Sequence, residues 1–171
     1  MNRVWVSGAL ALLALSFPAP ALSAFSPSMV GIGPHGYDWL IGTWTCKNAM
    51  PSAMGGPATT TLTVARSVNG SLSIHSGGDG FDTLGYVALA AKTKTWWNPT
   101  ALADGDNSNE SSQQTGKKTL WTGTFYDAES GKTMQIRDTY TVSSGSSFKD
   151  LSEAQVGGTW KTQANTTCMK S

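Results

Sequence analysis

Two charged residues interrupt stretches of sequence whose alternate positions are otherwise largely apolar. Arg66 lies in such a pattern between positions 62 and 68, and Asp138 in another between positions 134 and 142. Because successive side chains of a β-strand point to opposite faces, both charges are expected to face the interior. A buried charge is costly unless it is paired. Arg66 and Asp138 therefore pair with each other, lie at a strand end near solvent, or act as polar anchors in a ligand cavity.

The chemistry that these two residues suggest first is ligand binding. We expect a small ligand to contact Arg66 and Asp138 together with Tyr140, Tyr86 and Trp44. An enzyme that acts in the same cavity through Asp138, Arg66 and Tyr140 is the alternative, because burial raises the pKa of a carboxyl group. The sequence shows no nucleophile or base partner for Asp138, so no catalytic residue is assigned. A structural or interaction protein with a filled core is a third hypothesis.

The remaining reactive residue types give weaker signals. His75 comes just before a glycine-rich turn and is expected to face solvent. Trp96 and Trp97 are adjacent, so one of them should lie in the core and the other should be exposed or at a cavity mouth. The two histidines and two cysteines are widely separated and show no metal-ligand spacing.

The first residues of the chain have the pattern of a cleavable secretory signal. Arg3 is followed by an almost unbroken apolar run from Val4 to Phe17, and then by small residues at which cleavage after Ser23 or after Ala24 both fit. We therefore predict a signal peptide over residues 1–24, a Pro/Gly-rich arm over 25–37 and one domain over 38–171. The protein is expected to be secreted or periplasmic. No later apolar run is long enough to span a bilayer, so no integral membrane segment is expected in the mature chain.

Charge and composition narrow the classes of partner. The chain has 12 basic and 11 acidic residues, a formal net charge of +1 and no strong clustering of either sign, which argues against nucleic acid. The spacing of Gly31, Gly33 and Gly36 matches a dinucleotide-binding loop, but that loop requires a strand before it and a helix after it. We therefore predict no cofactor. The expected partner is a small apolar or amphipathic ligand, and the oligomeric state is left open.

Alternating runs separated by turn residues predict the elements that would position these side chains. Asn69-Gly70 gives the strongest hairpin signal, and the polar stretch from Asp104 to Lys118 is expected to be a mobile loop near a barrel mouth. The pattern predicts an all-β fold, an antiparallel up-and-down β-barrel of about 8–10 strands. The predicted strands are Leu40–Lys47, Thr59–Val68, Leu72–Ser76, Thr83–Ala91, Thr95–Leu102, Thr119–Asp127, Thr133–Ser143, Phe148–Val156 and Thr159–Met169.

A closed barrel places its first and last strands side by side, and each of these two predicted strands carries one cysteine. Cys46 and Cys168 are the two cysteines of the chain. In an exported protein, an even number of cysteines indicates a structural disulfide. We therefore predict a Cys46–Cys168 disulfide that joins the two terminal strands.

Four short motifs carry a resemblance to a known group of proteins. Gly42-x-Trp44 on the first strand, Lys92-Thr-Lys-Thr-Trp96, Gly157-Gly-Thr-Trp160 and Thr167-Cys168 resemble small secreted bacterial lipocalin-like domains of the calycin type. The similarity covers most of residues 39–170, and it extends more weakly to nitrobindin-like and fatty-acid-binding barrels. The resemblance implies a lipocalin-like barrel that binds a small, mostly apolar ligand. Nitrobindin-like relatives hold haem through a late histidine, and this chain has no histidine after His75.

Overall fold

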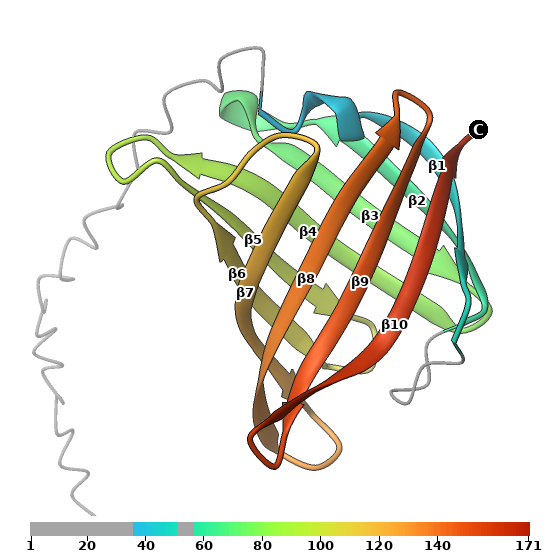
Figure 1. The fold of residues 1–171 in the computed structure, drawn as a ribbon, viewed down its shortest axis with the longest axis vertical. Helices are drawn as coiled ribbons and strands as arrows, with labels where there is room; N and C mark the ends of the chain where they lie inside the picture. The colour runs from blue at the N-terminus through green and yellow to red at the C-terminus, as the bar shows by residue number, and fades with distance from the viewer. Residues whose placement is uncertain (1–35, 51–56) are drawn as a thin grey trace, which may run out of the picture.

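The chain folds into ten antiparallel strands, shown in Figure 1. The structure, a computed structural model, describes residues 36–50 and 57–171, so the predicted signal peptide and most of the predicted arm lie outside the described residues. A 3₁₀ turn, η1 (Asp38–Leu40), leads into the first strand, and a second, η2 (Val68–Gly70), joins β2 to β3. The strands are β1 (Gly42–Asn48), β2 (Thr59–Arg66), β3 (Leu72–Gly78), β4 (Phe81–Ala90), β5 (Thr95–Leu102), β6 (Asn107–Ser112), β7 (Lys118–Asp127), β8 (Lys132–Ser144), β9 (Ser147–Val156) and β10 (Thr159–Lys170).

The sheet closes on itself, as predicted from the run of short turns. Each strand pairs with its neighbour in sequence, and β1 pairs with β10 to complete the barrel. In that last pair, Cys46 lies opposite Cys168 and the two form a disulfide, with their Cα atoms 4.0 Å apart. The predicted disulfide is therefore confirmed. A structural disulfide of this kind is typical of proteins from oxidising compartments.

One predicted loop is in fact a strand. The segment from Asp104 to Lys118 contains β6, which pairs with both β5 and β7. The prediction of a mobile loop was wrong because β6 has almost no apolar residues, and its inward positions are taken by Ser108, Glu110 and Ser112 instead. Backbone pairing on both edges forms the strand, and its polar side chains face a cavity inside the barrel.

Glycine makes the close approach of β6 to β7 feasible. Gly123 on β7 lies opposite Glu110, and a Cβ atom at this position would stand only 2.0 Å from the backbone carbonyl oxygen of Asn109. An inward-facing glycine allows a barrel strand to bend sharply against its neighbour. At η2, Asn69 takes a positive φ of 55°, in agreement with the predicted Asn-Gly turn.

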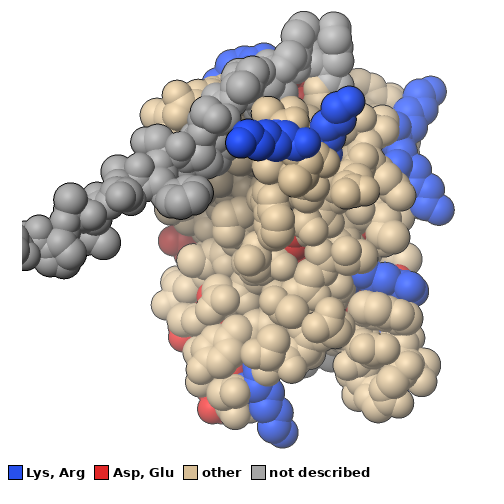
Figure 2. All heavy atoms as spheres, turned by 90° about the vertical axis from the view of Figure 1, so that its left-hand side faces the viewer, with Lys and Arg blue, Asp and Glu red and all other residues tan. Residues whose placement is uncertain are grey.

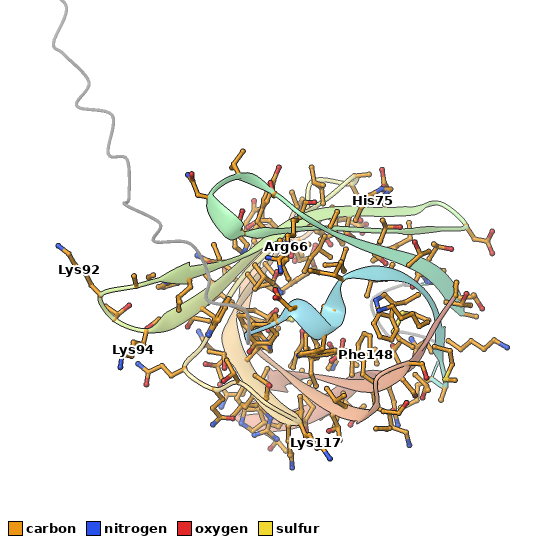
Figure 3. The ribbon with its side chains drawn as sticks, turned by 90° about the horizontal axis from the view of Figure 1, so that it is seen from above. Arg66, His75, Lys92, Lys94, Lys117 and Phe148 are labelled. Carbon is orange, nitrogen blue, oxygen red and sulfur yellow. A yellow bond between two sulfur atoms is a disulfide. The ribbon has the colours of Figure 1, made fainter. Side chains whose placement is uncertain are left out.

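The end of the barrel where β1 begins is closed by the segment just before that strand. Figure 3 looks onto this end and shows η1 lying across the opening, with Phe148 in the interior beside it. Tyr37 and Leu40 are almost fully buried, and the Tyr37 hydroxyl donates a hydrogen bond to the backbone carbonyl of Gln114 at 2.8 Å. Tyr37 was assigned to the arm, but its side chain belongs to the core of the barrel. Aromatic side chains fill this end of the interior, because the Tyr37 ring centre lies 4.9 Å from that of Trp96 and 5.1 Å from that of Trp121.

The outer surface carries few charged side chains. Figure 2 shows one face of the barrel, most of which is formed by uncharged residues, with separate lysine and arginine side chains on it and only small areas of acidic side chains. The small number of charges reflects the Ser- and Thr-rich outward positions of the strands. Within the described residues, no helix has the length and apolar character needed to cross a bilayer.

The barrel cavity as a candidate functional site

A cavity of about 430 Å³ occupies the interior between the aromatic end and the opposite end of the barrel. It is lined by residues of the turns at that opposite end, including Asp79 and Gly80 of the β3–β4 turn and Asp104 and Asp106 of the β5–β6 turn. The cavity therefore reaches the end of the barrel that η1 does not cover. Its volume lies within the range of small-molecule sites in proteins, which is about 300–1,000 Å³.

Much of the cavity wall is apolar, as the alternation of the strands predicts. Apolar side chains from seven strands and from η1 face it because every second residue of a barrel strand points inward. The apolar lining residues are Leu40, Leu62, Val64, Ile74, Phe81, Leu102, Phe125, Ile136 and Phe148.

Three carboxyl groups interrupt this apolar wall. Glu110 comes from β6, Asp138 from β8 and Asp150 from β9, and all three line the cavity. Ser152, the register partner of Asp138, donates a hydrogen bond from its hydroxyl to the Asp138 carboxylate. Glu110 and Asp138 are within hydrogen-bonding contact of each other, and Asp138 and Asp150 are close enough for their charges to interact. We call Glu110, Asp138 and Asp150 the carboxyl cluster.

The interior of the barrel makes the charged form of each cluster member costly. Burial raises the pKa of Glu110 well above its usual range, and the nearby carboxylates of Asp138 and Asp150 raise it further. Burial likewise raises the pKa of Asp150, followed by repulsion from Asp138. The pKa of Asp138 is also raised by burial, although its hydrogen bonds from Ser152 and Glu110 oppose the shift. Part of the cluster is therefore expected to hold protons at pH values where exposed carboxyl groups are ionised.

The cluster also has acceptor atoms without partners among the described residues. Glu110 is 3 % exposed, and its Oε1 atom has no hydrogen-bond partner in the described part of the chain; the same is true of Asp150 Oδ1. A buried polar atom left unpaired costs about 1–3 kcal/mol, and more when it is charged. A bound donor group in the cavity would remove that cost.

The charged residues that line the cavity are all acidic. Among the described residues that line it there is no lysine, arginine or histidine, whereas seven of the 11 acidic residues of the chain lie there. These seven are Asp79, Asp104, Asp106, Glu110, Asp138, Asp150 and Glu153. Although the net charge of the chain is close to zero, acidic side chains gather at the cavity and the basic side chains lie elsewhere.

Arg66 does not lie in the cavity. It is the last residue of β2, at the end covered by η1, and its Nη2 atom donates a hydrogen bond to Asp38 Oδ2 at 2.7 Å. Its side chain is 54 % exposed, so this position corresponds to the strand-end alternative considered from the sequence. Arg66 does alternate with Leu62 and Val64 on the inward face of β2. Because it is the last residue of that strand, however, its side chain reaches solvent at the end of the barrel. The expected pairing of Arg66 with Asp138 does not occur.

Two of the aromatic residues predicted to contact a ligand do not line the cavity. Tyr86 is 44 % exposed on the outer surface of β4, because its neighbours Gly85 and Val87 take the inward positions. Trp44 is almost fully buried in the core, where its indole Nε1 donates a hydrogen bond to the backbone carbonyl of Leu40 at 2.7 Å. Tyr140, in contrast, lines the cavity beside the cluster, and burial raises its pKa, with Asp150 and Asp138 adding to the shift.

The residue that covers the first-strand tryptophan is a lysine. The Nζ atom of Lys170, on β10, lies 5.1 Å from the centre of the Trp44 ring. A cation over an indole face is attracted by the ring quadrupole. The contact joins the same two strands as the disulfide and leaves Trp44 with a structural role.

The other expectations for single residues concern the outer surface. His75 faces solvent as predicted, and its Nε2 atom lies 2.6 Å from Asp82 Oδ1 on the neighbouring strand. Trp96 is buried and Trp97 is 44 % exposed, in agreement with the predicted division between core and surface. With Arg66 paired to Asp38 and away from Asp138, the structure does not bring together the three residues considered for an enzyme.

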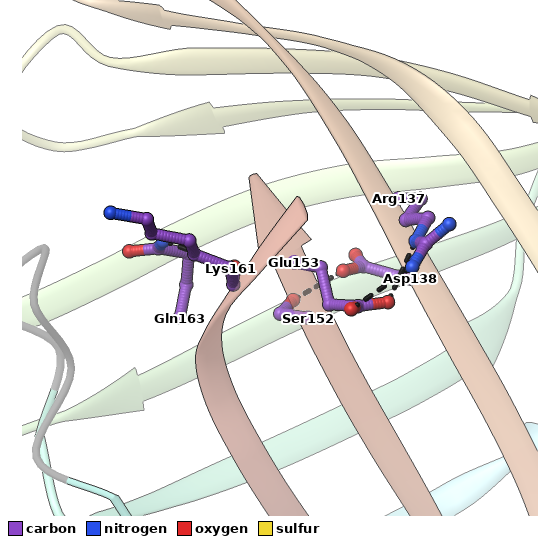
Figure 4. A network of polar contacts seen from close by, with 6 residues as sticks. All are labelled: Arg137, Asp138, Ser152, Glu153, Lys161 and Gln163. Carbon is purple, nitrogen blue, oxygen red and sulfur yellow. Dashed lines mark hydrogen bonds and ion pairs between the residues drawn. The ribbon is translucent and has the colours of Figure 1, made fainter. Parts of the chain in front are cut away.

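A second polar network, in which Glu153 of the cavity lining pairs with Arg137, lies directly beside the cluster. Arg137 donates two hydrogen bonds to the Glu153 carboxylate, at 2.7 and 3.0 Å, and its guanidinium stacks 4.4 Å above the Trp160 ring. Figure 4 shows this pair together with the Ser152–Asp138 contact. Arg137 precedes Asp138 on β8, and Glu153 follows Ser152 on β9. The Arg137–Glu153 pair therefore fixes β8 against β9 and helps to hold Asp138 and Ser152 in register.

Two of the three cluster members were missed by sequence reasoning, although a signal for them exists. Glu110 lay in the stretch interpreted as a loop, and Asp150 alternates with Phe148 and Ser152 on the inward face of β9. The signal for Glu110 would have been its alternation with Ser108 and Ser112 in a segment between two predicted strands. No protein-family model matches the chain, and no match was found among curated proteins.

Proposed function

We propose that the barrel binds a small amphipathic molecule in its cavity. The observation that carries the proposal is a cavity of about 430 Å³ that reaches one end of the barrel and combines apolar side chains with a buried group of three carboxyls. Apolar walls favour the apolar part of a ligand, and the cluster of Glu110, Asp138 and Asp150 favours a polar end. A filled core would have left no such space.

The site and the disulfide together support a secreted or periplasmic protein of the lipocalin-like type. The closed antiparallel barrel agrees with a calycin-like architecture, and the Gly42-x-Trp44 motif stands at the start of β1. The disulfide agrees with export through the predicted signal peptide. Kinship with lipocalins is part of the proposal and rests on the barrel and these motifs.

The proposal predicts that an environment-sensitive neutral naphthalene fluorophore binds saturably to the purified barrel. Leu62 lines the cavity, whereas Leu84 is 51 % exposed on the outer surface. A tryptophan at position 62 should fill much of the space, so Leu62→Trp is expected to weaken binding at least about tenfold. Leu84→Trp introduces the same residue outside the barrel and is expected to leave the affinity unchanged.

Circular dichroism and thermal unfolding of both variants show whether the barrel is intact. Native mass spectrometry of protein purified from its own host provides a second measurement, since a retained ligand should appear as a constant added mass. Absence of saturable binding by the wild type, or equal binding by the folded Leu62→Trp variant, would contradict a ligand site in the barrel.

A further inference from the structure

We propose that the polar end of the bound molecule is an organic cation, such as a primary alkylammonium or amidinium group, held by the carboxyl cluster of Glu110, Asp138 and Asp150. This inference rests on the proposed function, because it names the chemical class of the ligand for the same cavity. Arg66, one of the two polar anchors considered from the sequence, takes no part in this site, because it pairs with Asp38 at the other end of the barrel.

The first argument is the sign of the charge along the cavity. The described lining residues include no basic side chain, while Asp79, Asp104 and Asp106 stand at the open end. Negative groups around a concave, low-dielectric opening attract cations and repel anions. A cation therefore meets favourable charge both at the mouth and at the inner cluster, whereas a carboxylate ligand meets repulsion at both.

The second argument is hydrogen-bond complementarity. Glu110 Oε1 and Asp150 Oδ1 lack partners among the described residues, and both belong to groups shielded from bulk solvent. An ammonium group has three donors and no acceptor, so it can satisfy unpaired carboxylate oxygens without leaving an atom of its own unmatched. An alcohol supplies only one donor, and a carboxylate ligand supplies none.

The arrangement of the acidic groups favours an organic cation over a metal ion. Among the residues that the structure describes, no three His, Cys, Asp or Glu side chains are arranged to ligate one metal. An ammonium or amidinium group on an apolar chain spreads its donors over a wider region. Its chain would lie against wall residues such as Ile136 and Phe125, which adjoin the cluster.

Binding of a cation must be coupled to release of protons. The titratable groups that face one another here are Glu110 from β6, Asp138 and Tyr140 from β8, and Asp150 from β9. Burial raises the pKa of each carboxyl, and repulsion from neighbouring carboxylates raises it further for Glu110 and Asp150, so part of the empty cluster retains protons. An incoming ammonium group forms an ion pair with a carboxylate, and the proton that this carboxyl held leaves to solvent. Amine affinity should therefore rise with pH as long as the amine stays protonated.

The test uses three ligands with the same apolar chain: octan-1-amine, octan-1-ol and octanoic acid, each displacing the neutral fluorophore. A hydrogen bond to a charged group is stronger than one between neutral groups, and this difference changes the dissociation constant about 10- to 100-fold. The amine should therefore bind about 10- to 100-fold more tightly than the alcohol. The acid should bind more weakly than the alcohol at neutral pH. Amine affinity should increase between pH 5 and pH 8, with alcohol affinity unchanged.

Charge-removing variants separate the cluster from other acidic groups. Asp150→Asn and Glu110→Gln keep the side-chain shapes and should reduce the preference for amine over alcohol at least about tenfold. Asp82→Asn removes the same charge from the outer surface, where Asp82 contacts His75, and should leave the preference intact. Calorimetry in two buffers of different ionisation enthalpy should detect a proton released on amine binding.

The outcomes distinguish this inference from the proposed function. If the fluorophore and all three ligands fail to bind, the ligand-site proposal itself is wrong, and the cation proposal with it. If the fluorophore and octan-1-ol bind but the amine binds no more tightly, or the acid binds best, only the cation proposal is overturned. A preference for amine that persists in Asp150→Asn and Glu110→Gln would also overturn it.

Discussion

The carboxyl cluster should make the empty barrel less stable as the pH rises. The pKa values of Glu110, Asp138 and Asp150 are raised in the folded state, so between the unfolded pKa, about 4, and the folded values the native protein binds more protons than the unfolded chain. Under that condition the free energy of unfolding falls as pH increases. The contribution of these protonated carboxyls to the free energy of unfolding is therefore fully present below about pH 4 and is lost progressively above it.

Replacing one carboxyl of the cluster by the corresponding amide should remove part of this decrease in the free energy of unfolding. Asp150→Asn is the sharpest change, because the pKa of Asp150 is raised first by burial and then by Asp138, and its Oδ1 atom has no partner among the described residues. At pH 7.5 the wild type either ionises this buried carboxyl beside Asp138 or holds its proton against the solvent, and the neutral amide avoids both costs. A buried polar group without a partner costs about 1–3 kcal/mol, so we expect a gain of that size at pH 7.5.

Urea unfolding of the non-reduced protein at pH 4 and pH 7.5 measures the effect. The wild type should be less stable at pH 7.5, and Asp150→Asn should exceed it there while matching it at pH 4. For a domain of this size, the expected gain corresponds to a rise in melting temperature of about 3–10 °C. Asp82→Asn, at a side chain that is 63 % exposed, is the control and should show no such pH-dependent gain. A wild-type stability that increases from pH 5 to pH 8, or an Asn variant that is destabilised equally at both pH values, would refute this reasoning.

Three further changes test the fold around the site. Replacing Cys46 and Cys168 by alanine opens a loop of 122 residues and should lower the free energy of unfolding by about 4–5 kcal/mol, as measured by denaturant titration against the oxidised wild type. Arg66→Met breaks the half-exposed pair with Asp38, so it should cost no more than about 1 kcal/mol and leave fluorophore binding unchanged; loss of binding would place Arg66 at the site after all. Gly123→Ala puts a Cβ atom against the backbone of β6 and should cost about 1–3 kcal/mol or more in thermal unfolding, whereas a neutral result would contradict the close approach of the two strands.

The local alternation of the sequence predicted most of the strands, because side-chain period and turn residues are properties of short segments. It also predicted which neighbours of Asp138 and Tyr140 share the inward face, and the even pair of cysteines on terminal strands predicted the disulfide. The extra strand β6 was not predictable in this way, since its inward residues are polar. Their environment exists only after β5 and β7 have closed around them.

Tertiary structure alone decided which charges meet. Alternation gives the face of a side chain but not its depth along the barrel, so Arg66 and Asp138 looked equivalent in the sequence although one lies at the covered end and the other inside. The neighbours of Asp138 depend on the register of strands that are far apart in the chain. That register brings Glu110 and Asp150 to the same cavity, 28 and 12 residues away in sequence (138 − 110 and 150 − 138). The sequence thus determines a barrel with polar residues facing inward, and only closure of the barrel makes three of them one acidic site.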